Sequence, residues 1–484
     1  MLLKRLRELG GETLIYGVPA IVARFLSVWL TPIYTRLLTP EDYGIMSLVG
    51  ATIVLIQSFA TLALDQAAIR WFIDADDSDG QRRPFATWAW MHFATATAAT
   101  VVLMLAGDRI SVLLTGSSKL APWLRLASIT IPLGVATSVG LTWLRMQRRA
   151  WATVALVTGT SVLQLAATFV LVVSMKRGLF GLYLAQVITA AIAMLVVLRI
   201  DASAMAPRLF NRAMLGAMLR YSAPLVPAAI AVWLVGSIDR FFVERFVSTT
   251  EVGVFAIGSS IASLLTLAIW AFQQAWAPFA LSICREPDAE KTFNTVFLGY
   301  CGVGALATAG LSMFAPLAIR ILATPAYDRA SLVVGTLAMS YVLMGLASVV
   351  SIGFTIAKAS RPTAIAVGIA AAVTVALNAA LVPRFGMIGS ATATLLGQSV
   401  QPAILLWRGQ HIYPISYPIR RGGALLAYGL LLVLLGETWL PSALTAYGFL
   451  IRLFSLASLP VFALAIGAVS PSQRKTLRLR LLRR

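Results

Sequence analysis

The stretch 16-YGVPAIVARFLSVWLTPIYTR-36 decides the fold class, because it is long and apolar enough to cross a membrane and carries Arg24 near its middle. About 11 residues, at roughly 1.5 Å each, separate Arg24 from either end, so its side chain does not easily reach the surface. An arginine at bilayer depth costs at least about 2.5–3.5 kcal/mol and normally faces a polar cavity or a partner. Arg24 is therefore a candidate functional residue, with a structural tie to another helix as the alternative.

Helical spacing gives this segment two different faces. One face holds small and polar residues, which suit a water-filled cavity: Tyr16, Ala20, Arg24, Ser27, Thr31 and Tyr34. The opposite face is apolar and suits lipid or a packed helix: Val18, Val22, Phe25, Trp29 and Ile33. We predict that a cavity lies on the side of Arg24.

Composition places the whole chain among membrane proteins. Of its 484 residues 59% are hydrophobic and 12% are charged, which is more apolar surface than one soluble core could bury. The net charge of +20 would suit nucleic acid, but the basic residues form short clusters between apolar runs. The positive-inside rule explains this distribution, so we expect a lipid bilayer and no nucleic acid as partner.

The cysteines and histidines are too few and too scattered for two other kinds of site. Cys284 and Cys301 cannot form a disulfide scaffold. His92 and His411, the two histidines of the chain, are far apart and lack metal-ligand spacing. We therefore expect no metal site and no cofactor.

Apolar runs predict about fourteen transmembrane helices. They are residues 13–35, 43–67, 85–106, 122–144, 151–174, 178–199, 221–243, 252–281, 293–318, 330–356, 362–383, 386–407, 422–440 and 444–468. An even number places both termini on one side of the membrane. Basic clusters, such as Arg145 to Arg149 and the tail from Arg474, make that side cytoplasmic. The connections on the other side are short, so no catalytic domain is expected there.

The chain repeats itself with an offset of roughly 205–212 residues. Three pairs of segments carry the repeat: Tyr16–Pro19 with Tyr221–Pro224, Thr39–Gly44 with Ser248–Gly253, and Gly178–Gly181 with Gly386–Gly389. Each copy contains about six predicted helices, an even number, so the copies share one orientation and are related by an axis along the membrane normal. The predicted fold is an all-α polytopic membrane protein with two six-helix lobes around a central cavity.

The repeat predicts three parts of the chain. Residues 1–200 form an N-lobe with helices 1–6. Residues 201–412 begin with an amphipathic linker on the cytoplasmic surface and continue as a C-lobe with helices 7–12. Residues 413–484 hold helices 13 and 14, which fall outside the repeat, and a basic cytoplasmic tail.

Polar residues in the second helix of each lobe are further candidates for the cavity wall. Asp65 falls opposite Gln273 and Gln274 when the two copies are aligned, and Ser58 shares a helical stripe with Asp65. Two alternatives stay open: Asp65 pairs with Arg70, and the glutamines form hydrogen bonds between helices.

A charged pair marks the seventh predicted helix. Asp239 and Arg240 lie near its outer end, where they would act as an external gate or a coupling site. A structural ion pair that includes Glu244 is the alternative.

Four segments carry a family resemblance. They are LTPEDYG at 38–44, Tyr221–Pro227 followed by Asp239–Phe241, Phe272–Phe279, and Leu377–Asn378 through Pro383–Gly389. In their order and spacing, which cover nearly the whole chain, they resemble the polysaccharide-biosynthesis flippases, the Wzx-type translocases of lipid-linked oligosaccharides. That family belongs to the multidrug/oligosaccharidyl-lipid/polysaccharide exporter superfamily, which also holds the lipid II flippase and the multidrug and toxin extruders.

The resemblance implies a flippase of the bacterial inner membrane. Its substrate would be an oligosaccharide on undecaprenyl diphosphate, moved from the cytoplasmic to the periplasmic leaflet by alternating access. The pathway would be the synthesis of lipopolysaccharide O-antigen, exopolysaccharide or capsule, with a polysaccharide polymerase and other assembly proteins as partners. Arg24 is the position that matches the essential first-helix arginines of the lipid II flippase.

The chemistry of the candidate residues agrees with such a substrate. A guanidinium in a low-dielectric cavity binds a diphosphate bidentately, which suits Arg24, while Ser27, Trp29 and Thr31 would meet the sugars. A cation or drug antiporter of the same fold should carry a deep acidic residue in its first helices, whereas the deep charge here is basic. A membrane enzyme of polysaccharide assembly would need paired carboxylates or a large extracytoplasmic loop, so we expect no enzyme.

Overall fold

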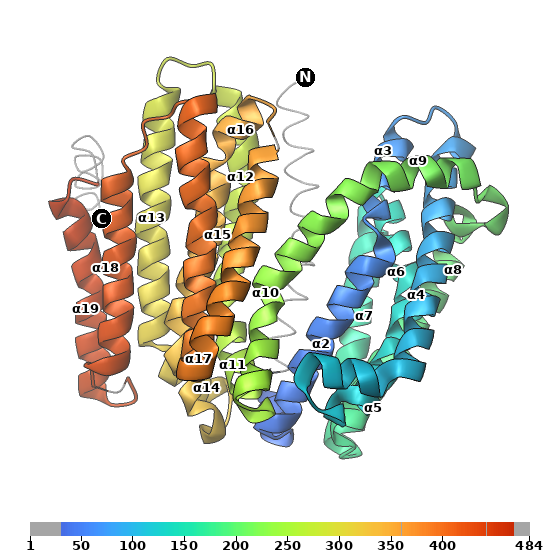
Figure 1. Ribbon diagram of the computed structural model, residues 1–484, viewed down its shortest axis with the longest axis horizontal. Coiled ribbons are helices and arrows are strands. Elements are labelled where there is room, and N and C mark those ends of the chain that lie inside the picture. Colours follow the sequence, from blue (N-terminus) through green and yellow to red (C-terminus); the bar gives the residue numbers. More distant parts are fainter. Residues whose placement is uncertain (1–30, 360, 442, 469–484) are drawn as a thin grey trace. The chain divides into compact units, whose positions relative to one another are not determined.

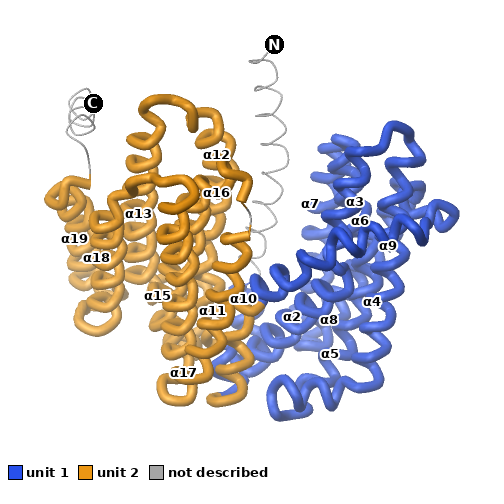
Figure 2. The backbone as a smooth tube through the Cα atoms, turned by 45° about the horizontal axis from the view of Figure 1, so that its top comes forward, with its two compact units in different colours: residues 1–233, 248–253 blue, residues 234–247, 254–484 orange. Residues whose placement is uncertain are grey.

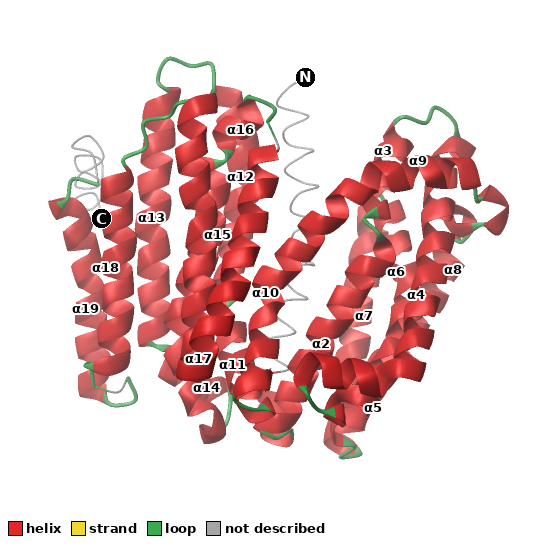
Figure 3. Ribbon diagram, viewed as in Figure 1, coloured by secondary structure: helices red, strands yellow, loops and turns green. Residues whose placement is uncertain are grey.

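The computed structural model of the protein describes residues 31–359, 361–441 and 443–468. Throughout these residues the regular structure is helical, and no strand occurs among them (Figure 3). Large apolar side chains cover the outside of several helices, and Leu105, Leu113 and Phe454 are each more than 80% exposed. Such a surface suits lipid and not water. The predicted all-α class is confirmed.

The described chain divides into two compact units, which Figure 2 colours separately. The first unit holds the residues up to Trp233 together with Ser248–Gly253, and the second holds Leu234–Val247 and the residues from Val254 onward. Two helices, α10 (Val226–Phe246) and α11 (Thr249–Ala262), contribute residues to both units.

The remaining helices belong to one unit each (Figure 1). The first unit contains α2 (Pro40–Thr61), α3 (Leu64–Ile73), α4 (Ser78–Thr115), α5 (Ala121–Ser128), α6 (Thr130–Met146), α7 (Ala150–Thr168), α8 (Gly178–Asp201) and α9 (Arg212–Ser222). The second unit contains α12 (Leu265–Ile283), α13 (Ala289–Met313), α14 (Ala315–Leu322), α15 (Ser331–Val350), α16 (Ile352–Ile356), α17 (Arg361–Ile412), α18 (Ile419–Thr438) and α19 (Ala446–Ala465).

Ten helices of the described chain are long and apolar enough to cross a bilayer, or up to twelve if each bent pair is counted as one span. The bent pairs are Ser118–Ser128 with Thr130–Met146, at 43°, and Thr249–Ala262 with Leu265–Ile283, at 41°. The chain is therefore a multi-pass membrane protein. The number of about fourteen stays a prediction, because residues 13–30 of the first span lie outside the described residues.

The 52-residue helix α17 covers two predicted spans in one bent element. The bend is at Gly386, whose φ of 56° lies in the left-handed region that glycine adopts at no steric cost. A buried hydrogen bond joins the two halves across the bend: the hydroxyl of Ser390 donates to Oδ1 of Asn378 at 2.6 Å. The amide of Asn378 in turn donates to the carbonyl of Thr374 at 2.9 Å.

The motif LTPEDYG forms the start of α2. Thr39 is the N-cap, and its hydroxyl accepts from the backbone N–H of Asp42 at 3.2 Å. The carboxylate of Asp42 accepts from the backbone N–H of Thr39 at 3.1 Å, which completes a capping box. Pro40 occupies the first helical position, where its missing N–H costs nothing.

Two glycines of the first unit let the beginnings of α2 and α11 cross with their backbones in contact. A Cβ atom added at Gly44 would overlap the carbonyl oxygen of Thr249, and one added at Gly253 would overlap the carbonyl oxygen of Pro40. Since 253 − 44 and 249 − 40 are both 209, the contact is made by equivalent residues of the two repeat copies. We call this contact the glycine crossing.

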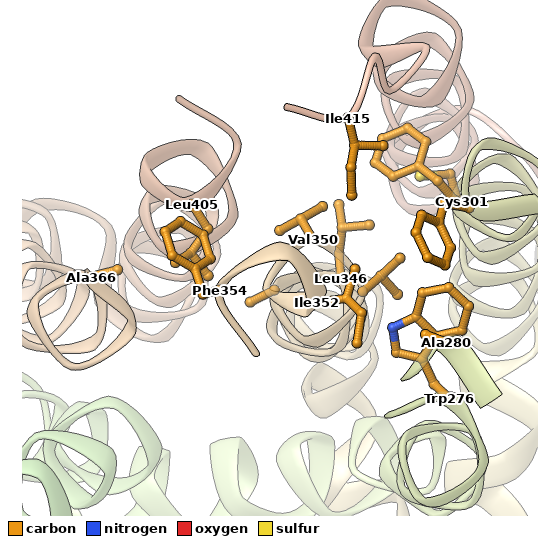
Figure 4. Close-up of a cluster of buried hydrophobic side chains, with 14 of the residues drawn as sticks. Trp276, Ala280, Cys301, Leu346, Val350, Ile352, Phe354, Ala366, Leu405 and Ile415 are labelled. Atoms are coloured by element: carbon orange, nitrogen blue, oxygen red, sulfur yellow. The ribbon is translucent and has the colours of Figure 1, made fainter. Parts of the chain in front are cut away.

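The second unit has a large apolar core, shown in Figure 4. Trp276 and Ala280 of α12, Cys301 of α13 and Leu346 of α15 meet there, and Leu405 of α17 closes it. Cys301 is buried and carries a free thiol, so its role is packing.

A buried arginine holds α19 in the second unit. Arg452 is only 4% exposed, and its guanidinium donates to three backbone carbonyls at 2.7–2.8 Å: those of Met313, Gly436 and Pro441. Met313 and Gly436 lie at the ends of α13 and α18, where carbonyls have no partner within their own helix. We call this arrangement the Arg452 clamp.

Candidate functional site

Most of the predicted site in the first helix lies beyond the described chain. Arg24, Ser27 and Trp29 lie outside the described residues. Thr31 lies in the described end of this helix, which runs to Leu37, and its side chain is buried.

The second predicted helix is broken in the first unit. α2 ends at Thr61 and α3 begins at Leu64, and the two residues between them, Leu62 and Ala63, have φ values of 53° and 52°. Left-handed backbone costs a side-chain-bearing residue roughly 1–2 kcal/mol, so the break is strained and must be held by its surroundings. Discontinuous membrane helices of this kind expose polar backbone groups to a cavity or ligand.

A polar cluster of side chains surrounds this break, and we call it the break cluster. The hydroxyl of Thr61 donates to the carbonyl of Gln57 at 2.9 Å and is therefore left to accept from Nε2 of His92, which lies 3.2 Å away. The hydroxyl of Thr95 donates to the carbonyl of Ala60 at 2.6 Å. These bonds tie α4 to the end of α2.

The imidazole of His92 is the buried centre of the break cluster. It is 5% exposed and lies parallel to the indole of Trp88. If Nε2 carries the proton, Nδ1 presents a buried lone pair, and no partner for it occurs among the described residues. The charge of Asp65 acts on this ring from α3.

Ser58 and Asp65 lie on the two sides of the break, Ser58 near the end of α2 and Asp65 in the first turn of α3. The carboxylate of Asp65 accepts from the amide of Gln66 at 2.8 Å, and its side chain is partly exposed. Arg70, its alternative partner, lies 3.4 Å from Asp74. Ser58 is half-buried, and its hydroxyl donates back to the carbonyl of Val54 at 2.9 Å.

The glutamines belong to α12 in the second unit and differ in their surroundings. Gln273 donates to the hydroxyl of Ser348 on α15 at 2.8 Å, which is the interhelical bond considered as its alternative role. Gln274 is exposed. Of the pair, Gln274 is the one free to meet a ligand from the surface of this unit.

Asp239 and Arg240 are neighbours on the part of α10 that belongs to the second unit. Asp239 is 4% exposed, and its carboxylate accepts from the backbone N–H of Arg240 at 2.8 Å. The guanidinium of Arg240 lies 3.5 Å from the carbonyl of Gly236. The buried carboxylate stands one residue from a charge of opposite sign, an arrangement that serves a gate, a coupling site or an ion pair equally.

Sequence reasoning did not single out His92 as part of a polar site. The signal was present, because His92 is one of two histidines and lies inside a predicted apolar span at 85–106. Its contact with Thr61 and its position within reach of the charge of Asp65 come from the packing of α4 on α2 and α3, and no sequence pattern indicates them.

A family model described as "Polysaccharide biosynthesis protein" matches residues 33–286, just over half of the chain. The chain belongs to this polysaccharide biosynthesis protein family. The resemblance inferred from its motifs is thereby confirmed. Comparison with curated proteins gives no match.

Two solved structures show which fold this polysaccharide biosynthesis protein has. One, described as "Lipid II flippase MurJ, inward closed conformation", is 14% identical with a TM-score of 0.73, and the alignment covers 94% of this chain and 98% of that chain. The other, an inward-facing multidrug resistance MATE family transporter of the MOP superfamily, is 17% identical with a TM-score of 0.67 and covers 80% and 94%. The predicted exporter-superfamily fold is confirmed.

Proposed function

We propose that the protein is a flippase that moves an oligosaccharide linked to undecaprenyl diphosphate from the cytoplasmic to the periplasmic leaflet. The observation that carries the proposal is the coincidence of a polysaccharide biosynthesis family match with a fold similar, over 94% of the chain, to a structure described as a lipid II flippase. The pathway proposed is O-antigen, exopolysaccharide or capsule synthesis, with a polymerase and other assembly proteins as partners. No catalytic step is part of it.

In this proposal different residues contact different parts of the substrate. Arg24 binds the diphosphate, because a planar guanidinium matches two phosphate oxygens at once. Ser27, Trp29 and Thr31 of the first helix meet the sugars, together with Ser58, Asp65 and Gln274. Gln273 holds α12 to α15 through its bond to Ser348. Asp239 and Arg240 act as gate or coupling site. The hydroxyls and the imidazole of the break cluster suit the same hydroxyl-rich ligand.

A drug or cation exporter is the second candidate function, and two observations favour it. The fold is similar to that of a multidrug resistance transporter, and Asp65 places a carboxylate in the second predicted helix. Binding of labelled undecaprenyl diphosphate and of a labelled cationic drug to the purified protein separates the two. Saturable binding of the drug alone would replace the flippase proposal.

Replacement of Arg24 tests the proposed role of this residue. Arg24→Ala removes the charge and its donors, so export of the polysaccharide should fall to background. Arg24→Lys keeps a charge without the planar fork and should retain little, and Arg24→Glu should be worst. The measurement is surface polysaccharide together with the amount of protein in the membrane. Wild-type export by Arg24→Ala at normal abundance would contradict the role, and loss of abundance would favour a structural tie.

Both termini are proposed to be cytoplasmic, and single cysteines test this. In a background with Cys284 and Cys301 replaced, a cysteine at Ser117 or Pro441 should react with an impermeant thiol reagent added outside the cell, and one at Asp79 should not. Ser117 follows α4 and Asp79 begins it, so the two report opposite ends of one helix. Labelling at Asp79 with protection at Ser117 would reverse the orientation.

A further inference from the structure

A small apolar groove opens on the outside of the first unit, where α4, α6 and α8 run side by side (Figure 1). Its volume is about 190 Å³. Trp90 and Phe93 of α4, Ala136 of α6, Leu198 of α8 and Met205 of the following turn line it, among other apolar residues. Trp90, Phe93 and Leu198 are 39–43% exposed, so the groove is open to the surroundings of the unit. We call it the connector groove.

The chain segment that closes one end of the groove is firmly held. After α8, the short turns Ser203–Met205 and Pro207–Leu209 pack on α4. The indole N–H of Trp90 donates to the carbonyl of Met205 at 3.1 Å. This indole N–H is the one hydrogen-bonding group among the lining side chains, and it is already bonded. The side chains that line the connector groove therefore offer an apolar surface to a ligand.

Two arginines adjoin the lining residues, and both are exposed. Arg199 follows Leu198 in the last turn of α8, and Arg208 lies in the turn that follows Met205. Within the described chain neither guanidinium has a carboxylate at ion-pair distance. Their charge is therefore available to an external anion.

The acidic residue between the arginines is already engaged elsewhere. The carboxylate of Asp201 accepts from the indole N–H of Trp143 at 3.1 Å, from the backbone N–H of Ser203 at 3.0 Å and from the hydroxyl of Ser203. The charge of Arg82 also acts on it. One carboxylate thus stands between two guanidinium groups in the sequence, so a net positive charge remains beside the residues that line the connector groove.

We propose that the connector groove binds an anionic glycerophospholipid of the bilayer, with one acyl chain on Trp90 and Phe93 and the phosphate on Arg199 and Arg208. Charge complementarity selects the headgroup, because arginines near the surface attract anionic lipid and the guanidinium matches phosphate. The hydrocarbon lining selects the chain. The bound lipid holds the turns after α8 against α4.

Fluorescence quenching by brominated lipids tests this site in the full-length protein. The protein is reconstituted in phosphatidylcholine vesicles that contain the same mole fraction of either acyl-brominated phosphatidylglycerol or acyl-brominated phosphatidylcholine. The quenching due to Trp90 is the part lost in Trp90→Phe. The quenching of Trp90 should reach half its maximum at a mole fraction of brominated phosphatidylglycerol that is on the order of tenfold lower than the mole fraction of brominated phosphatidylcholine needed for the same effect. Equal quenching by the two lipids would overturn the proposal.

A matched pair of arginine variants identifies the headgroup contact. In Arg199→Gln/Arg208→Gln the preference for phosphatidylglycerol at Trp90 should disappear. In Arg109→Gln, which removes an exposed charge near the other end of α4, it should persist. A preference that survives the double substitution would overturn the role of these arginines. Displacement of brominated phosphatidylglycerol by stoichiometric undecaprenyl phosphate would assign the groove to a substrate-like lipid and overturn the proposal as well.

Thermal unfolding in a neutral detergent gives a second readout that does not depend on Trp90→Phe. Added phosphatidylglycerol should raise the midpoint of the wild type and of Arg109→Gln more than added phosphatidylcholine does. It should not do so for Arg199→Gln/Arg208→Gln. Ala136→Phe, which fills the groove, should abolish the difference between the lipids. If phosphatidylglycerol still raised the midpoint more than phosphatidylcholine in both Arg199→Gln/Arg208→Gln and Ala136→Phe, the lipid would bind at another site. None of these readouts involves transport, so failure of the proposed flippase function leaves them interpretable.

Discussion

Gly253→Val should be one of the most destabilising single substitutions in this protein. At the glycine crossing the new Cβ would overlap the carbonyl oxygen of Pro40 and lie 3.0 Å from the backbone nitrogen of Gly44. Both are backbone atoms of α2, so no rotamer change relieves the clash and the helices must separate. Overpacking of a core typically costs about 1–3 kcal/mol, and a backbone clash belongs at the upper end. A fall in the thermal unfolding midpoint of the purified protein measures it.

Gly50→Val is the matched control for this substitution. Gly50 lies on α2, six residues after Gly44, and a Cβ atom there meets nothing within 4 Å. Valine is a better helix former than glycine, so the variant should be at least as stable as the wild type. Equal stability of Gly253→Val and Gly50→Val would show that the crossing does not restrict side chains.

Arg452→Ala should have a comparable effect in the second unit. The substitution removes the donors of the Arg452 clamp and leaves the carbonyls of Met313, Gly436 and Pro441 without their partner in a buried region. Each buried unsatisfied polar group costs about 1–3 kcal/mol, and the positive charge at the ends of α13 and α18 is lost as well. The variant no longer buries a charge, which offsets part of this cost. We therefore expect the free energy of unfolding to fall by about 3 kcal/mol. Thermal unfolding again provides the measurement.

Two further arginine variants separate the geometry of the clamp from its charge. Arg452→Lys keeps the charge, but an ammonium lacks the planar fork that reaches three separate carbonyls, so most of the loss should remain. Arg421→Gln removes an exposed guanidinium that donates to the carbonyl of Gly467 at 3.2 Å and should change stability by less than about 0.5 kcal/mol. If Arg452→Lys were as stable as the wild type, the charge and not the fork would hold α19.

The helical class could be predicted from the sequence because it follows from local patterns. Apolar runs long enough to span a bilayer must form helices there, because only internal hydrogen bonds satisfy their backbone groups in lipid. The helices of the described chain lie at those runs. The pairing of Gly44 with Gly253 was inferred from two short similar motifs, and the structure brings these two residues together. What the motifs do not contain is the reason for glycine at both positions, which is contact between distant backbones.

Other features could not be predicted because they depend on packing between distant segments. The two predicted spans of α17 follow each other directly, because Gly386 adopts a non-helical conformation that bends the chain between them. Arg70 is paired with Asp74 and not with Asp65, because a helical neighbour four residues away is closer than one five residues away. The partners of His92 and Arg452 come from other helices. The proposed substrate contacts of Arg24 depend on a ligand that no sequence pattern contains.

The glycine crossing also determines how α2 and α11 can move against each other. Ordinary helix pairs interlock side chains, and a rotation between them requires several rotamers to change together. Here the surfaces in contact are glycine methylenes and peptide carbonyls, a smooth pair that can exchange weak Cα–H···O contacts as the angle changes. At this contact the main chain of α2 meets the main chain of α11, so a rotation between the two helices there requires no rotamer change at either glycine.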